Sequence, residues 1–157
     1  MNEVGLFMVR AIAEENNHPN FVSRYNLGKV NRRGMKSLGL LEELEMKDAE
    51  WIMTQIMDVL SFLHGFDISF RFSAENLFVN FKDKEIAFLD FEVKTRKDSI
   101  LIARDDIMHA SGIVYGKVLP SSYLYDPVCH KHFNVLRKAT MGHYNKALTV
   151  KRDLLKK

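Results

Sequence analysis

The stretch from Ile68 to Val93, ISFRFSAENLFVNFKDKEIAFLDFEV, constrains the fold more than any other part of this chain. Two short apolar segments, Leu77–Asn80 and Ile86–Leu89, flank the polar sequence Lys82–Glu85, which is typical of a turn. The pattern predicts two strands joined by a turn, with a loop before the first strand and a loop after the second. A hairpin of this kind brings the residue before its first strand close to the residue after its second strand.

Asn76 precedes the first expected strand and Asp90 follows the second. We therefore expect an amide and a carboxylate to lie side by side at the open end of the hairpin. One amide oxygen and one carboxylate suit Mg²⁺, a hard ion that takes oxygen ligands and keeps several waters. In the structural alternative, Asn76 caps a turn and Asp90 hydrogen-bonds a loop. Both readings remain open at the level of the sequence.

The sequence ENLFV at Glu75–Val79, followed by LDF at Leu89–Phe91, resembles the catalytic loop and DFG region of the protein-kinase-like superfamily. In that superfamily an Asn and an Asp hold the magnesium ions of the nucleotide, and an Asp in the HRD motif orients the nucleophile. The resemblance implies Asn76 and Asp90 as magnesium ligands. It also implies Ser73 as a residue of the ATP site, so Mg²⁺ and ATP are the expected cofactors if the chain binds any.

The departures from the kinase pattern are as informative as the match. The HRD triplet falls on Ser69–Arg71, so Arg71 occupies the position of the catalytic Asp, and a guanidinium cannot accept a proton. Arg71 either pairs with a carboxylate structurally or binds a phosphate or acidic partner in the cleft. Asp67 is the nearest carboxylate that could substitute. Ser73 stands beside the transferred phosphoryl group where the family has a charged or polar partner, and Glu92 replaces the Gly of DFG.

The N-terminal part carries a second resemblance. Glu3–Glu15 is predicted to be a helix, with apolar residues on one face: Val4, Phe7, Met8, Ala11 and Ile12. The sequence HPNFV at His18–Val22 resembles the segment that joins helix αC of kinases to the next strand of their upper lobe. We therefore expect Phe21–Tyr25 and Met35–Leu41 to form a hairpin of the upper lobe. Val9 then takes the position of the αC glutamate, unless Glu3 or Glu14 fills that role in a shifted register. The glycine-rich loop and its phosphate-binding Lys would precede Met1.

The remaining pattern predicts a largely helical lower lobe. Asp48–His64 is the strongest predicted helix, capped by Asp48 and apolar on most of its circumference, and the sequence LHGFDI at its end resembles the kinase αE region. Asp105–Asp106 opens a predicted helix to Tyr115 that resembles αF, whose early Asp binds the backbone of the catalytic loop. Lys94–Arg104 is short and polar. His130–Lys157 is expected to form one or two helices with these inner residues: Phe133, Val135, Leu136, Tyr144 and Leu148.

The predicted fold class is α+β: a truncated kinase-like domain with a mostly helical lower lobe. Residues 1–45 would form a partial upper lobe and hinge, and residues 46–157 the lower lobe of a single domain. A chain of 157 residues with 46% hydrophobic and 27% charged residues is ordinary for a globular domain. No apolar run approaches a membrane span or a secretion signal, and Cys129 is the sole cysteine, so a cytoplasmic location or delivery to a host cytoplasm is expected.

The function expected from this resemblance is that of a catalytically impaired pseudokinase that binds a partner protein, such as another kinase or a chain that completes the upper lobe. The alternative is an active, atypical Mg-ATP-dependent phosphotransferase, acting on protein or on lipopolysaccharide or sugar and completed by a partner chain or dimer. A nucleic-acid role ranks last, because the net charge of +3 is modest and its basic residues are typical of a solvated face. Cys129, His130 and His132, with His109 and His143 elsewhere, suggest a zinc site. No second paired motif accompanies them, so histidines on the surface or lining helices are expected instead.

Overall fold

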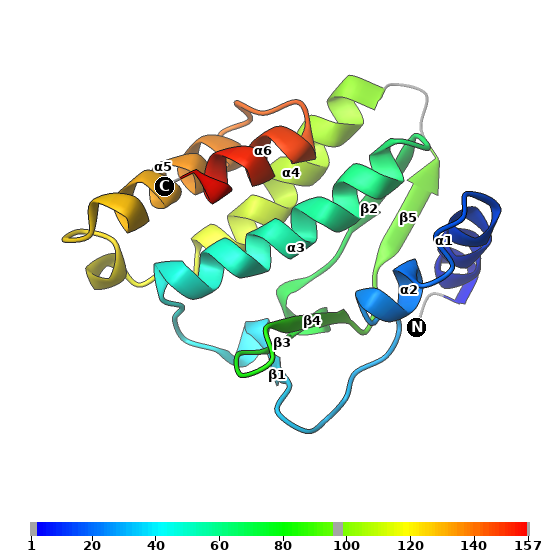
Figure 1. Ribbon diagram of the computed structural model, residues 1–157, viewed down its shortest axis with the longest axis horizontal. Helices are drawn as coiled ribbons and strands as arrows, with labels where there is room; N and C mark the ends of the chain where they lie inside the picture. The colour runs from blue at the N-terminus through cyan, green and yellow to red at the C-terminus, as the bar shows by residue number, and fades with distance from the viewer. Residues whose placement is uncertain (1–2, 96–98, 157) are drawn as a thin grey trace.

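The long helix α3 (Met46–His64) is the axis around which the structure packs. The computed structural model describes residues 3–95 and 99–156. In Figure 1, α3 runs through the middle of the molecule with the C-terminal helices along one side and the strands and N-terminal helices along the other. The further helices are α1 (Glu3–Glu15), α2 (Phe21–Arg24), α4 (Ser99–Tyr115), α5 (Pro127–Thr140) and α6 (Ala147–Leu155), with 3₁₀ turns η1 (Leu38–Leu40), η2 (Ala74–Asn76) and η3 (Pro120–Ser122). The strands are β1 (Lys36–Ser37), β2 (Ile68–Arg71), β3 (Leu77–Asn80), β4 (Glu85–Phe88) and β5 (Glu92–Thr95).

Helix α3 is confirmed, with a different start from the one predicted. It begins at Met46, and Asp48 lies in its first turn, where the Asp48 carboxylate accepts a hydrogen bond from Trp51 Nε1 at 3.2 Å. Apolar residues on several of its faces are buried because α4, α5, α6 and β2 all pack against it. Its buried residues are Met46, Ala49, Trp51, Ile52, Met53, Ile56, Met57, Val59, Leu60 and Leu63.

The predicted hairpin between β3 and β4 is present. The two strands are antiparallel, and Leu77 pairs with Phe88. In the turn, the Asn80 side-chain oxygen accepts hydrogen bonds from the backbone N–H groups of Lys82 and Asp83, at 3.0 and 3.1 Å. These bonds satisfy turn donors that the strands leave unpaired, which explains why this polar sequence reverses the chain.

The segments flanking the hairpin were expected to be loops, and this expectation is wrong. Strands β2 and β5 pair antiparallel, with Ile68 opposite Thr95 and Arg71 opposite Glu92. Phe70 in β2 stacks on Phe91 just before β5, with ring centroids 5.1 Å apart, and both rings are buried. The pairing of β2 with β5 is therefore supported by an aromatic contact between residues far apart in the sequence, which a local sequence pattern cannot predict.

The predicted upper-lobe hairpin does not form. Phe21–Tyr25 is mostly helical as α2, and Met35–Leu41 contains only the two-residue strand β1 before it turns into η1. Strand β1 pairs with β3, giving the order β1-β3-β4 in this sheet of the described residues. Asn26 adopts a left-handed φ of 53°, which ends α2 and sends Leu27 to a bridge with β4. The strand propensity of the residues in Phe21–Tyr25 is therefore outweighed by these tertiary contacts.

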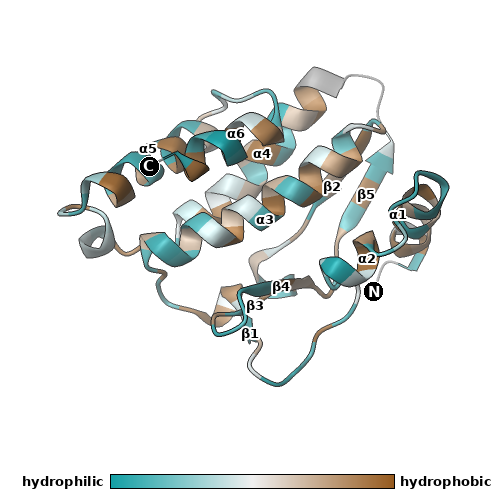
Figure 2. Cartoon of the chain, in the orientation of Figure 1, coloured by the Kyte–Doolittle hydropathy of each residue, from teal (hydrophilic) through white to brown (hydrophobic). Residues whose placement is uncertain are grey.

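Helix α1 is confirmed, and its predicted apolar face is right in part, because Met8 and Ile12 pack against the core. Gly5, Val9 and Ala13, each four residues apart, are its buried residues. Val4 and Phe7 point outward and are 77% and 71% exposed. Figure 2 shows brown, apolar stretches on α1. The helix thus carries apolar residues on more than the side that packs against the rest of the chain.

The C-terminal helical region is confirmed as α5 and α6. Asp126 caps α5 by accepting hydrogen bonds from the backbone N–H groups of Val128 and Cys129. Of the expected inner residues, Val135, Leu136 and Tyr144 are buried and Phe133 packs partly against the core. The prediction for Leu148 is wrong, since it is 59% exposed while α6 buries Val150 and Leu154 instead.

Helix α4 begins at Ser99, so Asp105–Asp106 lies inside it and does not open it as predicted. The polar segment Lys94–Arg104 contains residues 96–98, which lie outside the described residues. Among the helices of the described residues, none combines the length and apolar character needed to cross a membrane.

Two glycine substitutions should change stability in opposite directions. A Cβ at Gly39 would meet the backbone N and Cα of Glu75 at 3.0 Å, so η2 must shift, and Gly39→Ala is expected to cost about 1–3 kcal/mol. A Cβ at Gly112, inside α4, would meet only the Thr140 methyl at 3.9 Å. Gly112→Ala should therefore gain about 0.5–1 kcal/mol from the lower entropy of the unfolded chain. Urea unfolding of both variants tests this, and equal effects would contradict it.

Candidate functional site

A cleft of about 670 Å³ lies where η2, the segment after β4 and helix α4 meet. The two ends of the β3–β4 hairpin are held together at Asn76, because Leu89 N–H donates a hydrogen bond to the Asn76 carbonyl at 2.9 Å. The volume of the cleft falls within the range of ordinary ligand sites. The residues that line it are Arg71, Phe72, Ser73, Ala74, Asn76, Asp90, Phe91, Glu92, His109 and Ile113.

Asn76 and Asp90, the two predicted metal ligands, line this same cleft. The Asn76 amide nitrogen donates to Ser73 Oγ at 2.9 Å, so the amide oxygen remains the Asn76 side-chain atom suited to a metal. Asp90 Oδ1 accepts from the Phe91 backbone N–H at 2.9 Å. Ser73, predicted to belong to the nucleotide site, therefore orients Asn76. Whether Mg²⁺ binds here stays a prediction.

The oxygen ligands in this cleft could hold Mg²⁺ only with water completing the coordination. Within the part of the chain that the structure describes, no group of three or more His, Cys, Asp or Glu side chains is placed to hold a metal. The suggested zinc residues Cys129, His130 and His132 therefore form no such group, and Cys129 is a buried free thiol.

Asp106 is the buried carboxylate that holds the wall of the cleft together. It is 1% exposed and accepts hydrogen bonds from Ser69 Oγ at 2.8 Å and the Phe70 backbone N–H at 2.9 Å. His64 Nε2 lies 2.8 Å from its second oxygen. Helix α4 is thus joined to the C-terminal end of α3 and to strand β2 through one side chain. The kinase resemblance predicts that an Asp early in this helix binds the backbone of Ser69–Arg71. The hydrogen bond from the Phe70 N–H to Asp106 is such a contact.

The surroundings of Asp106 favour its charged form. Burial by itself raises the pKa of this carboxyl, but hydrogen bonds from His64, from the Phe70 backbone and from Ser69 oppose it, and the pKa lies below its usual value. A carboxylate this deeply buried is stable only when its lone pairs are occupied. The network therefore locks β2 in place as long as Asp106 is ionised.

Arg71, at the position where the kinase resemblance puts the base, points to the same carboxylate. Its Nε lies 3.3 Å from Asp106 Oδ1, and its side chain is 37% exposed. The backbone pairs Arg71 with Glu92 across β2 and β5. Of the two interpretations of Arg71, the structure therefore contains the first, a structural pairing with a carboxylate, that of Asp106. Its guanidinium also lines the cleft, where it supplies positive charge.

Other candidates lie elsewhere. Asp67 is exposed, has a left-handed φ of 57°, and is outside the set of cleft-lining residues. Val9 is fully buried, whereas Glu3 and Glu14, the alternatives for the αC acid, are exposed. No sequence reasoning placed His109 in the cleft, where its Nε2 lies 2.7 Å from the Phe72 carbonyl. The sequence indicated only that His109 belongs to a helix.

The charges lining the cleft favour a cation over a bare anion. Arg71 is opposed by two carboxylates, those of Asp90 and Glu92. A polyphosphate entering this cleft would meet more negative than positive charge, so it would need a divalent cation to neutralise it. The cleft can therefore position an anion that is bound to a metal. At the position where the kinase resemblance puts the general base, however, it carries Arg71, which is not a carboxylate.

No protein-family model matches this chain, and a search of curated proteins found no match. The class defined by the fold is α+β: within the described residues, helices α3 and α4 pack against β2, and the strands form two small antiparallel sheets.

Asp106→Asn should destabilise the protein by about 3 kcal/mol at neutral pH, because a buried, hydrogen-bonded carboxylate loses its charge while its donors remain. The pKa of Asp106 is lower in the folded than in the unfolded chain, so its stabilisation is present above the unfolded value and disappears as pH falls through the folded value. The gap in unfolding free energy between native and variant chains should therefore shrink in acid.

Urea unfolding at a series of pH values measures this gap. Asp105→Asn, the neighbouring half-buried carboxyl on α4, is the matched control and should change stability by less than about 1 kcal/mol. A gap for Asp106→Asn that stays constant down to acid pH would contradict the assigned role.

Proposed function

We propose that this chain is a kinase-like protein, a catalytically impaired pseudokinase, that acts by binding a partner protein. A cytoplasmic location, in the producing cell or in a host cell, belongs to the same proposal. It rests on the motif resemblance of the sequence and on the chemistry of the cleft.

The observation that carries the proposal is the position of Arg71. It takes the place of the expected catalytic Asp, and its Nε is 3.3 Å from the buried Asp106 carboxylate. Phosphoryl transfer depends on several positioned groups acting together, among them one that orients the nucleophile. A guanidinium tied to a buried carboxylate cannot accept a proton, so a cleft of this kind would bind without turning over.

The exposed apolar side chains of α1 support the binding part of the proposal. Val4 and Phe7 are one helical turn apart and are 77% and 71% exposed. Leu40, in η1, is 84% exposed. A partner that covers α1 would remove both α1 side chains from water, and an aromatic residue that becomes buried in an interface is a common energetic anchor.

A second candidate is an active, atypical Mg-ATP-dependent phosphotransferase. The observation that favours it is that Asn76 and Asp90 line one cleft of about 670 Å³, large enough for a nucleotide. In this reading a partner chain or a second copy completes the nucleotide site, and Mg²⁺ offsets the carboxylates of the cleft.

Calorimetric titration with Mg-ATP separates the two candidates. For the pseudokinase we expect no phosphate transfer from ATP by the native chain, and no metal-dependent binding that Asp90→Ala abolishes. Glu85→Ala removes an exposed carboxylate of β4 outside the cleft and is the matched control. Metal-dependent binding lost in Asp90→Ala but kept in Glu85→Ala, together with measurable phosphate transfer, would favour the phosphotransferase.

A pull-down from the native host tests the partner surface. Phe7→Ser should reduce retention of a specific partner by at least about tenfold, because it removes an exposed aromatic anchor without touching the buried face of α1. Leu124→Ser, which alters an apolar side chain of similar exposure, 54%, far along the chain, should leave retention unchanged. Equal retention by both variants would show that α1 is not the interface.

A further inference from the structure

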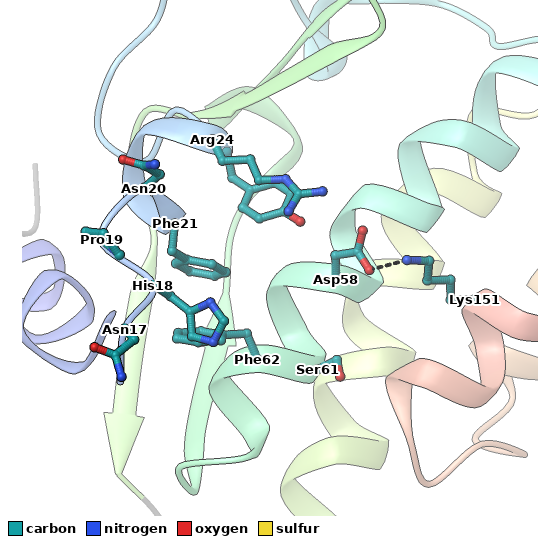
Figure 3. A pocket seen from close by; sticks show the side chains of 11 residues that line it. Asn17, His18, Pro19, Asn20, Phe21, Arg24, Asp58, Ser61, Phe62 and Lys151 are labelled. Carbon is teal, nitrogen blue, oxygen red and sulfur yellow. Dashed lines mark hydrogen bonds and ion pairs between the residues drawn. The ribbon is translucent and has the colours of Figure 1, made fainter. Parts of the chain in front are cut away.

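A second cavity, of about 520 Å³, lies between the segment preceding and including α2, helix α3 and helix α6 (Figure 3). Its lining residues are Asn17, His18, Pro19, Asn20, Phe21, Arg24, Tyr25, Asp58, Ser61, Phe62 and Lys151. It shares no residue with the cleft of Asn76 and Asp90. Neither the kinase resemblance nor the proposed function assigns it a role.

One wall of this cavity is aromatic. Phe21 and Phe62 are stacked with ring centroids 4.1 Å apart, and His18 meets Phe62 edge-on at 5.2 Å. Phe21 is buried, Phe62 is half-buried, and His18 is exposed. Figure 3 shows the three rings grouped on one side of the cavity. Such a group offers ring faces and edges to a flat apolar ligand.

The other side of the cavity is charged. Lys151 Nζ pairs with Asp58 Oδ1 at 2.7 Å, which links α6 to α3. Arg24 lies over the Tyr25 ring, 5.4 Å from its centroid, and within the described residues no carboxylate forms an ion pair with it. The cavity therefore contains two side-chain cations, Arg24 and Lys151, and one carboxylate, Asp58.

The Tyr25 hydroxyl belongs to the charged side. Burial and the nearby negative charge of Asp58 raise the pKa of Tyr25, so the hydroxyl stays protonated as a hydrogen-bond donor and acceptor. Asp58 is already engaged with Lys151, which leaves Arg24 as the cation that carries the excess positive charge of the cavity. A guanidinium of this kind binds carboxylate and phosphate oxygens through parallel hydrogen bonds.

We propose that this cavity binds a small planar aromatic molecule with one anionic group. The ring would lie against Phe62 and His18, and the acid group would reach Arg24. A single negative charge matches the single uncompensated cation, whereas a second negative charge on the ligand would be repelled by Asp58. An aliphatic acid would lose the contact with the aromatic wall, and a neutral aromatic ring would lose the contact with Arg24.

Ligand-observed NMR titration of the full chain with indole-3-acetate tests the proposal. We expect saturable binding of one molecule per chain at millimolar concentration. Indole-3-acetamide, which keeps the ring but not the charge, should bind roughly tenfold more weakly, since a hydrogen bond to a charged group is lost. Cyclohexylacetate, which keeps the charge but not the aromatic ring, should bind about three- to tenfold more weakly.

Two variants locate the binding. Arg24→Gln should weaken indole-3-acetate roughly tenfold and abolish its preference over the amide, because both probes then lack the ionic contact. Arg10→Gln, an exposed arginine of α1 outside the cavity, should leave the affinity unchanged. Phe62→Leu should weaken binding about three- to tenfold, with circular dichroism showing that the fold is retained.

The proposal is overturned if the native chain shows no saturable binding, if acid and amide bind equally, or if Arg24→Gln and Arg10→Gln have the same affinity. An unfolded Phe62→Leu chain would not change these outcomes, since Arg24 is exposed and its replacement leaves the core intact. The cavity shares no lining residue with the cleft, so failure of this test leaves the function proposed for the cleft unaffected, and the reverse is also true.

Discussion

The buried carboxylate of Asp106 is the interaction on which the arrangement of the cleft depends. It joins helix α4 to two elements much earlier in the chain, because donors from His64 on α3 and from Ser69 and Phe70 on β2 converge on it. A buried charge is costly unless nearly all of its lone pairs are occupied, so this network tolerates little displacement of any partner. The strand β2 and the start of the cleft are consequently held in one position relative to α4.

Arg71 connects this structural network to the question of function. The Arg71 side chain forms an ion pair with Asp106, and it also lines the cleft. One side chain therefore stabilises the fold and supplies charge to the candidate site. A pairing of this kind is compatible with a binding protein, in which rigidity of the cleft matters more than proton transfer. The cavity beside α2 is chemically different, because its aromatic wall and the cation of Arg24 suit a ligand that the more acidic cleft would repel.

Local patterns in the sequence predicted the elements whose stabilising contacts are local or repeat along one helix. Helix α3 and the hairpin of β3 and β4 are examples, since the apolar spacing and the polar turn suffice to define them. The nearness of Asn76 to Asp90 followed from hairpin geometry, and both residues do line one cleft. The prediction of a strand at Phe21–Tyr25 was wrong. The residues have a high strand propensity, but the segment is helical and Phe21 stacks on Phe62 of α3.

The sequence by itself determined the α+β class, the main helices, the hairpin and the presence of an arginine where the kinase resemblance expects an acid. Only the tertiary structure decided that β2 pairs with β5, that Arg71 meets Asp106, and that Arg24 and Phe62 line a common cavity. The physical reason is separation along the chain. Periodicity reports which side of an element is apolar, whereas pairing of distant residues depends on which packing satisfies buried polar groups together.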